Sequence, residues 1–321
     1  MRIVSLLPSA TEILCLIGGR ALLVGRSHEC DFPLGLESVP ILTSQRTPDG
    51  ASPAEIDAAV RAQLSTNSSL YSLDTALLAS LKPDLILTQD LCRVCSIDLN
   101  TVLALASTLS PAPQIICLNP QGLEDVYDDI LRVGAAAGLS TQAAAAVVSL
   151  RERFFRASDH VNQFIDGPNV AFLEWTDPLF IGGHWTPQLI ERAGARHPMN
   201  PTQGLPDSGA AAGPQAAARV AGKSIRVPPE ILIASRPEAL IICPCGVPLP
   251  QVRTMAAALS NQPWWPELSA VRAGRIALVD GNQMFNRPGP RLVDAFEWLV
   301  GWLNDRPELI PTNFPWEPFR E

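Results

Sequence analysis

Short runs of apolar residues alternate along the chain with amphipathic stretches of ten or more residues. The runs are rich in Val, Ile and Leu, and each is short enough to form one strand buried on both faces. They cover residues 2–6, 22–25, 84–88, 114–118, 169–174, 239–243 and 275–280. Strands that alternate with helical stretches are typical of βα units, in which helices flank a mainly parallel sheet. The pattern therefore predicts an α/β protein.

A longer amphipathic stretch separates the fourth run from the fifth. Between residues 141 and 164 apolar side chains recur every three or four positions, as they do on one face of a helix. Ser140 is suited to cap the start of this helix, and Pro168 prevents its continuation. One arrangement is a single continuous sheet with the helix on its face. The other is two lobes and a connecting helix, at residues 1–138, 167–321 and 139–166.

Residues 198–222 lack this periodicity. They are rich in Pro, Gly and Ala, which favour loops over regular elements. We expect a flexible insertion in the second lobe.

Composition narrows the class of protein. Of 321 residues, 47% are hydrophobic and 17% charged, which is typical of a folded globular chain. No apolar run approaches the roughly 20 residues that a membrane span needs. The 24 basic residues are scattered and outnumbered by 32 acidic ones, so a nucleic-acid surface is not expected.

The start of the chain and its cysteines bear on location. The first residues form a strand pattern without the charged leader and apolar segment of a secretion signal, which predicts a cytoplasmic location. Seven cysteines, an odd number, do not suggest a disulfide framework. We expect free thiols.

Polar, aromatic and sulfur-containing side chains follow five of the predicted strands. Since the carboxyl ends of parallel strands form the edge at which α/β sheets bind ligands, these residues are candidate ligand contacts. They are Ser27, His28, Glu29, Asp31, Phe32, Gln89, Asp90, Glu174, Trp175, His184, Trp185, Phe285, Asn286 and Arg287. His28 and five cysteines at the same edge are candidate metal ligands, the cysteines being Cys30, Cys92, Cys95, Cys243 and Cys245.

Four segments resemble a known family. Residues 5–12 (SLLPSATE), 25–33 (GRSHECDFP), 81–87 (LKPDLIL) and 285–291 (FNRPGPR) are similar to the periplasmic-binding-protein-like carriers of cobalamin and ferric siderophores that serve ABC importers. The resemblance covers nearly the whole chain. It implies two lobes joined by one rigid helix, a ligand held between the lobes and no catalysis. It therefore favours the two-lobed arrangement.

The resemblance also implies roles for particular segments. Residues 27–33 and 89–95 would line a corrinoid cleft from the first lobe, and residues 285–287 would face them from the second. Asp98 and Glu230 match the acidic residues through which such carriers dock on their transporter. The cysteine-rich edge departs from the pattern of exported cobalamin carriers.

The cysteines leave alternatives open. Cys92 and Cys95 have the spacing of half a metal site, and with His28 and the other thiols they suggest a transition metal or an iron–sulfur cluster. Each cysteine could instead be a buried apolar side chain. A third hypothesis is a thiol-dependent enzyme. The sequence contains no phosphate-binding, dinucleotide-binding or nucleophile-elbow motif. We expect a non-catalytic protein that binds a corrinoid or another metal-bearing cofactor.

Overall fold

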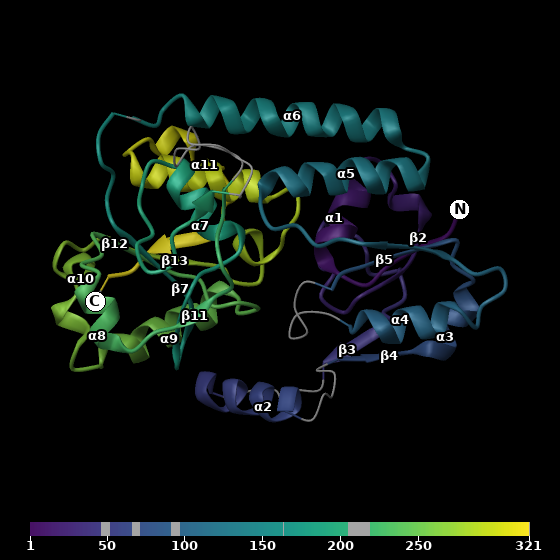
Figure 1. Cartoon of the computed structure of the whole chain (residues 1–321), viewed down its shortest axis with the longest axis horizontal. Coiled ribbons are helices and arrows are strands. Elements are labelled where there is room, and N and C mark those ends of the chain that lie inside the picture. The colour runs from purple at the N-terminus through teal and green to yellow at the C-terminus, as the bar shows by residue number, and fades with distance from the viewer. Residues whose placement is uncertain (46–51, 66–70, 91–96, 163, 205–218, 321) are drawn as a thin grey trace. The chain divides into compact units, whose positions relative to one another are not determined.

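The computed structural model describes residues 1–45, 52–65, 71–90, 97–162, 164–204 and 219–320. The chain forms two compact units (Figure 1). Unit 1 comprises residues 1–120 and 124–150, and unit 2 comprises residues 121–123 and 151–321. The α/β prediction is confirmed in both, because each unit has a sheet with parallel central strands and helices on its faces.

Unit 1 is built on a four-stranded parallel sheet in the order β2-β1-β5-β6. Its strands are β1 (Ile3–Ser5), β2 (Leu23–Arg26), β5 (Leu85–Thr88) and β6 (Gln114–Cys117). Helices α1 (Pro8–Leu16) and α5 (Leu123–Ala137) cover one face of the sheet, and α3 (Thr75–Leu81) and α4 (Leu99–Ala106) cover the other (Figure 1). All four residues of β5 are buried, as expected for a strand enclosed by two helical layers.

A second, two-stranded ribbon in unit 1 was not predicted. Strands β3 (Thr43–Gln45) and β4 (Tyr71–Leu73) pair antiparallel, with Thr43 opposite Leu73 and Gln45 opposite Tyr71. Helix α2 (Pro53–Ser65) lies in the chain between them. Ribbons this short carry too few residues for a detectable apolar alternation.

Unit 2 contains a six-stranded sheet in the order β11-β8-β7-β12-β13-β14. The central strands β7 (Val170–Thr176), β12 (Ala239–Ile242) and β13 (Ile276–Val279) are parallel and were predicted. The outer strands β8 (Leu179–Ile181), β11 (Ile225–Arg226) and β14 (Trp316–Pro318) pair antiparallel and were not predicted. Alternate residues of the central strands face a core shared with α8 (Pro229–Ala234), α9 (Leu249–Ser260) and α10 (Ser269–Arg272).

The other face of this sheet packs against aromatic side chains. Helices α7 (Trp185–Arg192) and α11 (Leu292–Leu303) lie on it (Figure 1). Phe285 contacts Phe172 of β7 and Trp298 of α11 with ring centroids 5.1 and 5.9 Å apart. This face is therefore filled by protein side chains.

The predicted long helix is α6 (Ser140–Ser158). It ends six residues before the expected position, because the chain tightens into turns in which the amides of His160 and Val161 bond to the carbonyls of Ala157 and Ser158. Arg153 on this helix pairs with Asp294 and Glu297 of α11. No helix within the described ranges is long and apolar enough to cross a membrane.

The remaining short elements lie at turns. Residues Arg20–Leu22, Trp265–Glu267, Met284–Asn286 and Pro307–Leu309 form 3₁₀ turns. Strands β9 (Gln203–Gly204) and β10 (Arg219–Val220) pair antiparallel at the two ends of residues 205–218, which contain most of the expected insertion and lie outside the described residues.

Candidate functional site

The loop after β2 places His28 in a network of hydroxyl groups. The Oγ1 atom of Thr43 accepts a hydrogen bond from the His28 backbone N–H at 3.0 Å and lies 2.7 Å from Nδ1 of the imidazole. The Thr43 hydroxyl donates to Ser27 Oγ at 3.0 Å. Burial lowers the pKa of His28, and this effect exceeds the opposing influence of Glu29. The imidazole is therefore neutral at pH 7.

The other imidazole nitrogen of His28 is not engaged. Nε2 is buried and has no hydrogen-bond partner among the described residues. Glu29 Oε1 lies 4.0 Å from it, and the Tyr71 hydroxyl donates to this same oxygen at 3.3 Å. The rings of His28 and Tyr71 have centroids 5.5 Å apart. Thr43 and Tyr71 were not among the residues singled out from the sequence, because nothing in their local pattern marks them.

The rest of this loop divides into a buried and an exposed part. Cys30 is 1% exposed, and the Thr11 hydroxyl donates to its sulfur at 3.1 Å. Asp31 and Phe32 are exposed, and Leu34 is 82% exposed. The loop thus buries its thiol and presents apolar side chains to the surface.

The loop after β5 is described only at its start. Gln89 is buried, whereas Asp90 is exposed and its backbone N–H donates to Asn119 at 2.7 Å. Cys92 and Cys95 lie outside the described residues.

In unit 2, Glu174 organises the turn that carries His184. Its carboxylate accepts hydrogen bonds from the Ser224 hydroxyl at 2.8 Å and from the Gly183 N–H at 3.2 Å. His184 has a φ of +56°, and its N–H bonds to the Gly222 carbonyl at 2.8 Å. Burial, and to a lesser extent Lys223, lowers the pKa of this histidine. Glu174 thus links β7 to the turn after β8 and to the segment before β11.

The candidate aromatic residues of unit 2 differ in exposure. Trp185 is 7% exposed and donates its indole N–H to the Phe285 carbonyl at 2.6 Å. Phe285 is 1% exposed, so both side chains belong to the core. Trp175 is half-buried and bonds to the Asp177 carbonyl at 3.1 Å. Of the three, Trp175 is the one with surface available to a ligand.

Cys243 is enclosed at the end of β12. It is fully buried, and the Asn286 amide donates to its sulfur at 3.5 Å and to its carbonyl at 3.3 Å. Burial raises the pKa of the Cys243 thiol well above its usual value, so the thiolate that a metal needs is disfavoured. Cys245 is half-buried. Arg287 is buried and donates to Asn282 at 3.3 Å.

Metal-ligand clusters of three or more His, Cys, Asp or Glu side chains are absent from the part of the chain that the structure describes. His28 and Cys30 belong to unit 1, and Cys243 and Cys245 to unit 2.

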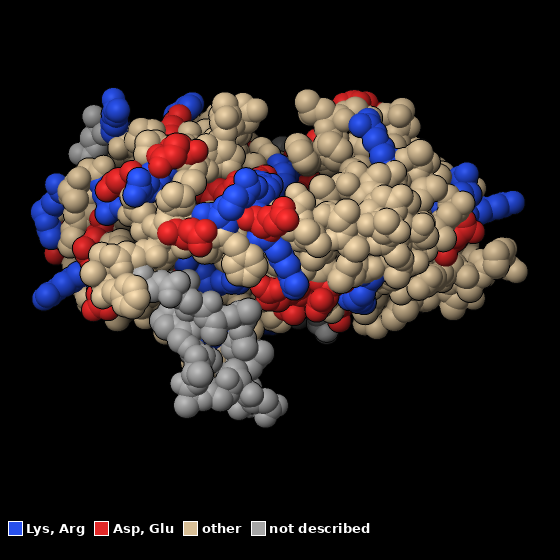
Figure 2. Space-filling model, turned by 90° about the horizontal axis from the view of Figure 1, so that it is seen from above, with Lys and Arg blue, Asp and Glu red and all other residues tan. Residues whose placement is uncertain are grey.

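The two acidic residues matched to transporter docking have different environments. Glu230 is exposed in the first turn of α8. Asp98 caps α4, where its carboxylate accepts the Thr101 N–H at 3.2 Å. Acidic and basic side chains are interspersed on the face shown in Figure 2, with no basic stripe among the residues drawn in colour there.

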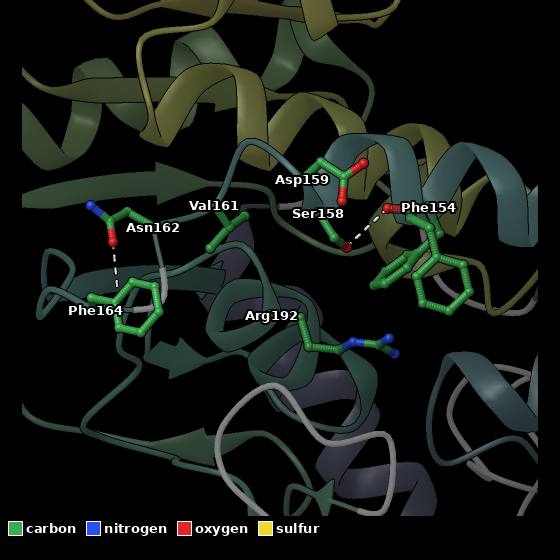
Figure 3. Close-up of a pocket in the computed structure, with 8 residues that line it drawn as sticks. Phe154, Ser158, Asp159, Val161, Asn162, Phe164 and Arg192 are labelled. Atoms are coloured by element: carbon green, nitrogen blue, oxygen red, sulfur yellow. Dashed lines mark hydrogen bonds between the residues drawn. The ribbon is translucent and has the colours of Figure 1, made fainter.

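A pocket also opens in unit 2, at the end of α6 (Figure 3). It has a volume of about 520 Å³. Its lining contains none of the residues predicted from the sequence and consists of Phe154, Phe155, Ser158, Asp159, Val161, Asn162, Phe164 and Arg192. The buried Arg192 guanidinium stacks 3.9 Å from the centre of the Phe154 ring, so one wall of the pocket is a cation–π pair.

No protein-family model and no curated protein matches the chain. Among solved structures, a periplasmic heme-binding protein of Pseudomonas aeruginosa has a TM-score of 0.67 and 20% identity, over 95% of this chain and 92% of that one. The periplasmic heme-binding protein RhuT of Roseiflexus also has a TM-score of 0.67 and 20% identity, over 95% and 98%. The periplasmic vitamin B12-binding protein BtuF of Vibrio cholerae has a TM-score of 0.61 and 17% identity, over 96% and 98%.

These neighbours confirm the resemblance seen in the sequence and correct one expectation. Since they are periplasmic proteins, they contradict the predicted cytoplasmic location. The prediction was wrong because it rested on the first residues of the chain alone. The neighbours are solute-binding proteins, in agreement with the expectation of a non-catalytic chain. The chain has the fold of the periplasmic binding proteins, among them proteins that bind heme or vitamin B12.

Proposed function

We propose that this chain is a non-catalytic binding protein for a metal tetrapyrrole, either a corrinoid or a heme. The proposal is supported by the fold, which is shared with proteins that bind vitamin B12 and heme. Both ligands are flat macrocycles that carry a metal ion with axial positions open to a protein side chain.

The main observation behind the proposal is the hydrogen bonding and the charge of the His28 imidazole. Its Nε2 atom is buried without a hydrogen-bond partner among the described residues, and burial keeps the ring neutral. An unsatisfied buried nitrogen costs roughly 1–3 kcal/mol, which indicates that something else completes the site. A neutral imidazole nitrogen is a good ligand for cobalt or iron. His28 therefore suits the metal of a tetrapyrrole.

We propose that exposed residues in each unit are further candidates for contact with the macrocycle and its substituents. Phe32 offers an exposed apolar face in unit 1, and Trp175 offers an accessible aromatic face in unit 2. Glu29, Asp31 and Asp90 supply oxygen atoms for polar substituents. Trp185 and Phe285 would act indirectly, because they pack in the core beneath the loops.

The thiolate-metal alternative has no comparable support. The described residues bring no three ligands together, and Cys30 and Cys243 are buried. We therefore do not favour a zinc or iron–sulfur protein or a thiol-dependent enzyme.

We also propose an ABC importer as partner. The fold supports this partner, and Glu230 is exposed for docking. Asp98 is less suited, since its carboxylate already caps α4. Glu230→Lys should weaken binding to the importer without changing affinity for the tetrapyrrole.

The test is titration of the purified chain with hydroxocobalamin and, separately, with hemin, followed by absorbance. We expect one of them to bind with a shifted metal spectrum, and His28→Ala to abolish the shift. His160→Ala is the matched control, because His160 is an exposed histidine that belongs to unit 2. Absence of binding of both probes at about 100 µM would refute the proposal. So would an H28A variant that binds with an unchanged spectrum.

A further inference from the structure

The strand β3 brings a buried hydroxyl against His28 from a part of the chain that is distant in sequence. Thr43 is 5% exposed and lies 15 residues from His28. Its position is fixed by backbone hydrogen bonds, since the Leu42 N–H donates to the Arg26 carbonyl and the Arg26 N–H donates to the Pro40 carbonyl. The segment that leads into Thr43 thus runs beside the end of β2, where the loop that carries His28 begins.

The pairing of β3 with β4 places Thr43 and Tyr71 on the same side of the ribbon. Residues directly opposite each other in an antiparallel pair share a face, and so do residues two apart in one strand. Thr43 lies two residues from Gln45, and Gln45 pairs with Tyr71. One face of the ribbon therefore supplies both the hydroxyl at Nδ1 and the phenol beside Glu29.

The hydrogen bonds around Thr43 determine where the proton of the imidazole resides. A hydroxyl has one proton to donate and two lone pairs to accept. The Thr43 proton goes to Ser27 Oγ, and one lone pair accepts the His28 backbone N–H. The contact of 2.7 Å with Nδ1 must then be one in which Nδ1 donates. Consequently Nδ1 carries the hydrogen, and Nε2 carries the free lone pair.

The positions of Glu29 and Tyr71 are consistent with a hydrogen on Nδ1 and none on Nε2. Within the described part of the chain, a hydrogen on Nε2 would find no acceptor at hydrogen-bond distance, since the Glu29 carboxylate oxygen is 4.0 Å away. That oxygen instead accepts the Tyr71 hydroxyl at 3.3 Å.

We infer that Thr43 is a positioning residue that holds His28 in the Nδ1–H tautomer and so directs the Nε2 lone pair at the metal of a bound ligand. The role toward a metal rests on the proposed function, whereas the tautomer is a property of the chain by itself. A group that fixes the tautomer of a histidine ligand typically contributes 10–100-fold to the affinity for its metal. Thr43 would therefore influence binding without touching the ligand.

The tautomer is measured in the ligand-free chain by nitrogen-15 NMR of labelled histidine. The chain has four histidines, and the spectrum of His28→Ala identifies the His28 signals by their loss. We expect the wild type to show a protonated Nδ1 and an unprotonated Nε2. Thr43→Val removes the hydroxyl, keeps the shape of the side chain and should shift the population toward Nε2–H. Thr43→Ser should restore the wild-type signals.

Thr88→Val is the matched control. Thr88 is also a buried strand threonine of unit 1, but its hydroxyl has no hydrogen-bond partner within the described ranges. It should leave the His28 signals unchanged, which separates a specific effect from a general loss of packing. Circular dichroism checks that each variant is folded.

Titration of the same variants separates the inference from the proposed function. If hydroxocobalamin or hemin binds the wild type, T43V should bind it about 10–100-fold more weakly, and T43S should retain wild-type affinity. The inference would be overturned if the His28 imidazole of the wild type carried its hydrogen on Nε2. It would also be overturned if T43V showed the wild-type tautomer. Both outcomes hold whether or not hydroxocobalamin or hemin binds. The expected tautomers in a chain that binds neither probe would support the positioning role of Thr43 and count against the proposed function alone.

Discussion

Burial is the main influence on the pKa values of several titratable side chains in this protein. His197 is the clearest example, because it is 1% exposed and neither of its ring nitrogens has a hydrogen-bond partner among the described residues. Burial lowers its pKa from 6.5 to about 4. In the unfolded chain the same side chain takes up a proton at a higher pH. Protonation below pH 6.5 therefore favours unfolding.

This gives a prediction for the pH dependence of stability. Above pH 6.5 the contribution of His197 to the free energy of unfolding is fully present, and it is lost as the pH falls from 6.5 to about 4. The loss amounts to about 3 kcal/mol. Urea denaturation at pH 7, 5.5 and 4 measures it. His197→Leu should flatten the dependence in this window, and an unchanged slope in H197L would contradict the assignment.

The two cysteines of the Cys243-Pro244-Cys245 turn should differ in reactivity. Cys245 is half-buried, whereas Cys243 is fully buried and its thiol pKa is raised by burial. We expect iodoacetamide at pH 8 to label Cys245 in the folded chain and Cys243 only after unfolding. Peptide mass spectrometry measures both sites, and Cys245→Ser provides the control. Equal labelling rates would show that the turn opens readily.

At the scale of elements, two loops of unit 2 meet through a backbone contact that tolerates no side chain. A Cβ atom on Gly281 would lie 1.7 Å from the carbonyl oxygen of Pro244. The Gly246 N–H also donates to the Gly281 carbonyl at 2.9 Å. The loop after β13 thereby holds the cysteine turn after β12.

Gly281→Ala should separate these loops. We expect a loss of more than about 2 kcal/mol of stability, since backbone must move to accommodate the methyl group. Thermal unfolding measures the effect. Gly222→Ala is the control, because a Cβ there meets only Asn200 at an ordinary 3.5 Å. Similar melting temperatures for G281A and G222A would mean that the loops are not in close contact.

Helix α6 is attached to α11 by a partly buried ion-pair cluster. Arg153 donates to Glu297 at 3.0 Å and also pairs with Asp294. Arg153→Met leaves both carboxylates without their partner and should cost about 2 kcal/mol of stability. Urea denaturation of R153M and of the exposed control Arg156→Met provides the comparison. A loss no greater than that of R156M would show that water replaces the guanidinium without penalty.

At the scale of the whole molecule, the two units should respond to acid in opposite directions. In unit 1, burial raises the pKa of Asp129 from 3.8 to about 6, against the influence of Arg132. A carboxyl whose pKa is raised by folding makes the fold more stable as the pH falls through that window. His197 has the reverse effect in unit 2.

Spectroscopy can follow the units separately, because all seven tryptophans lie beyond residue 174 and report only on unit 2. When the pH is lowered from 7 to 5, we expect the urea midpoint from tryptophan fluorescence to fall relative to the midpoint from circular dichroism, which reports on both units. Asp129→Asn should reduce the separation, and so should H197L. Coincident midpoints in the wild type would indicate that the units unfold as one.

Much of the fold followed from the sequence because its central strands are buried on both faces. All seven apolar runs correspond to strands, among them residues 84–88 (β5) and 239–243 (β12), since strands enclosed by helices on both faces are rich in Val, Ile and Leu. The outer strands β8 and β14 were missed. Their pairing depends on partners elsewhere in the chain rather than on a pattern of their own.

The order of residues was sufficient to predict the α/β class, the long helix, the resemblance to binding proteins and the candidate loop around His28. These features are local, because they depend on the order of residues within one segment. Only the folded structure shows that Cys243, Trp185 and Phe285 are core residues. It also shows that Thr43 and Tyr71 lie beside His28. Burial and hydrogen bonds between residues far apart in the chain arise only when the chain is folded, so no local pattern could indicate them.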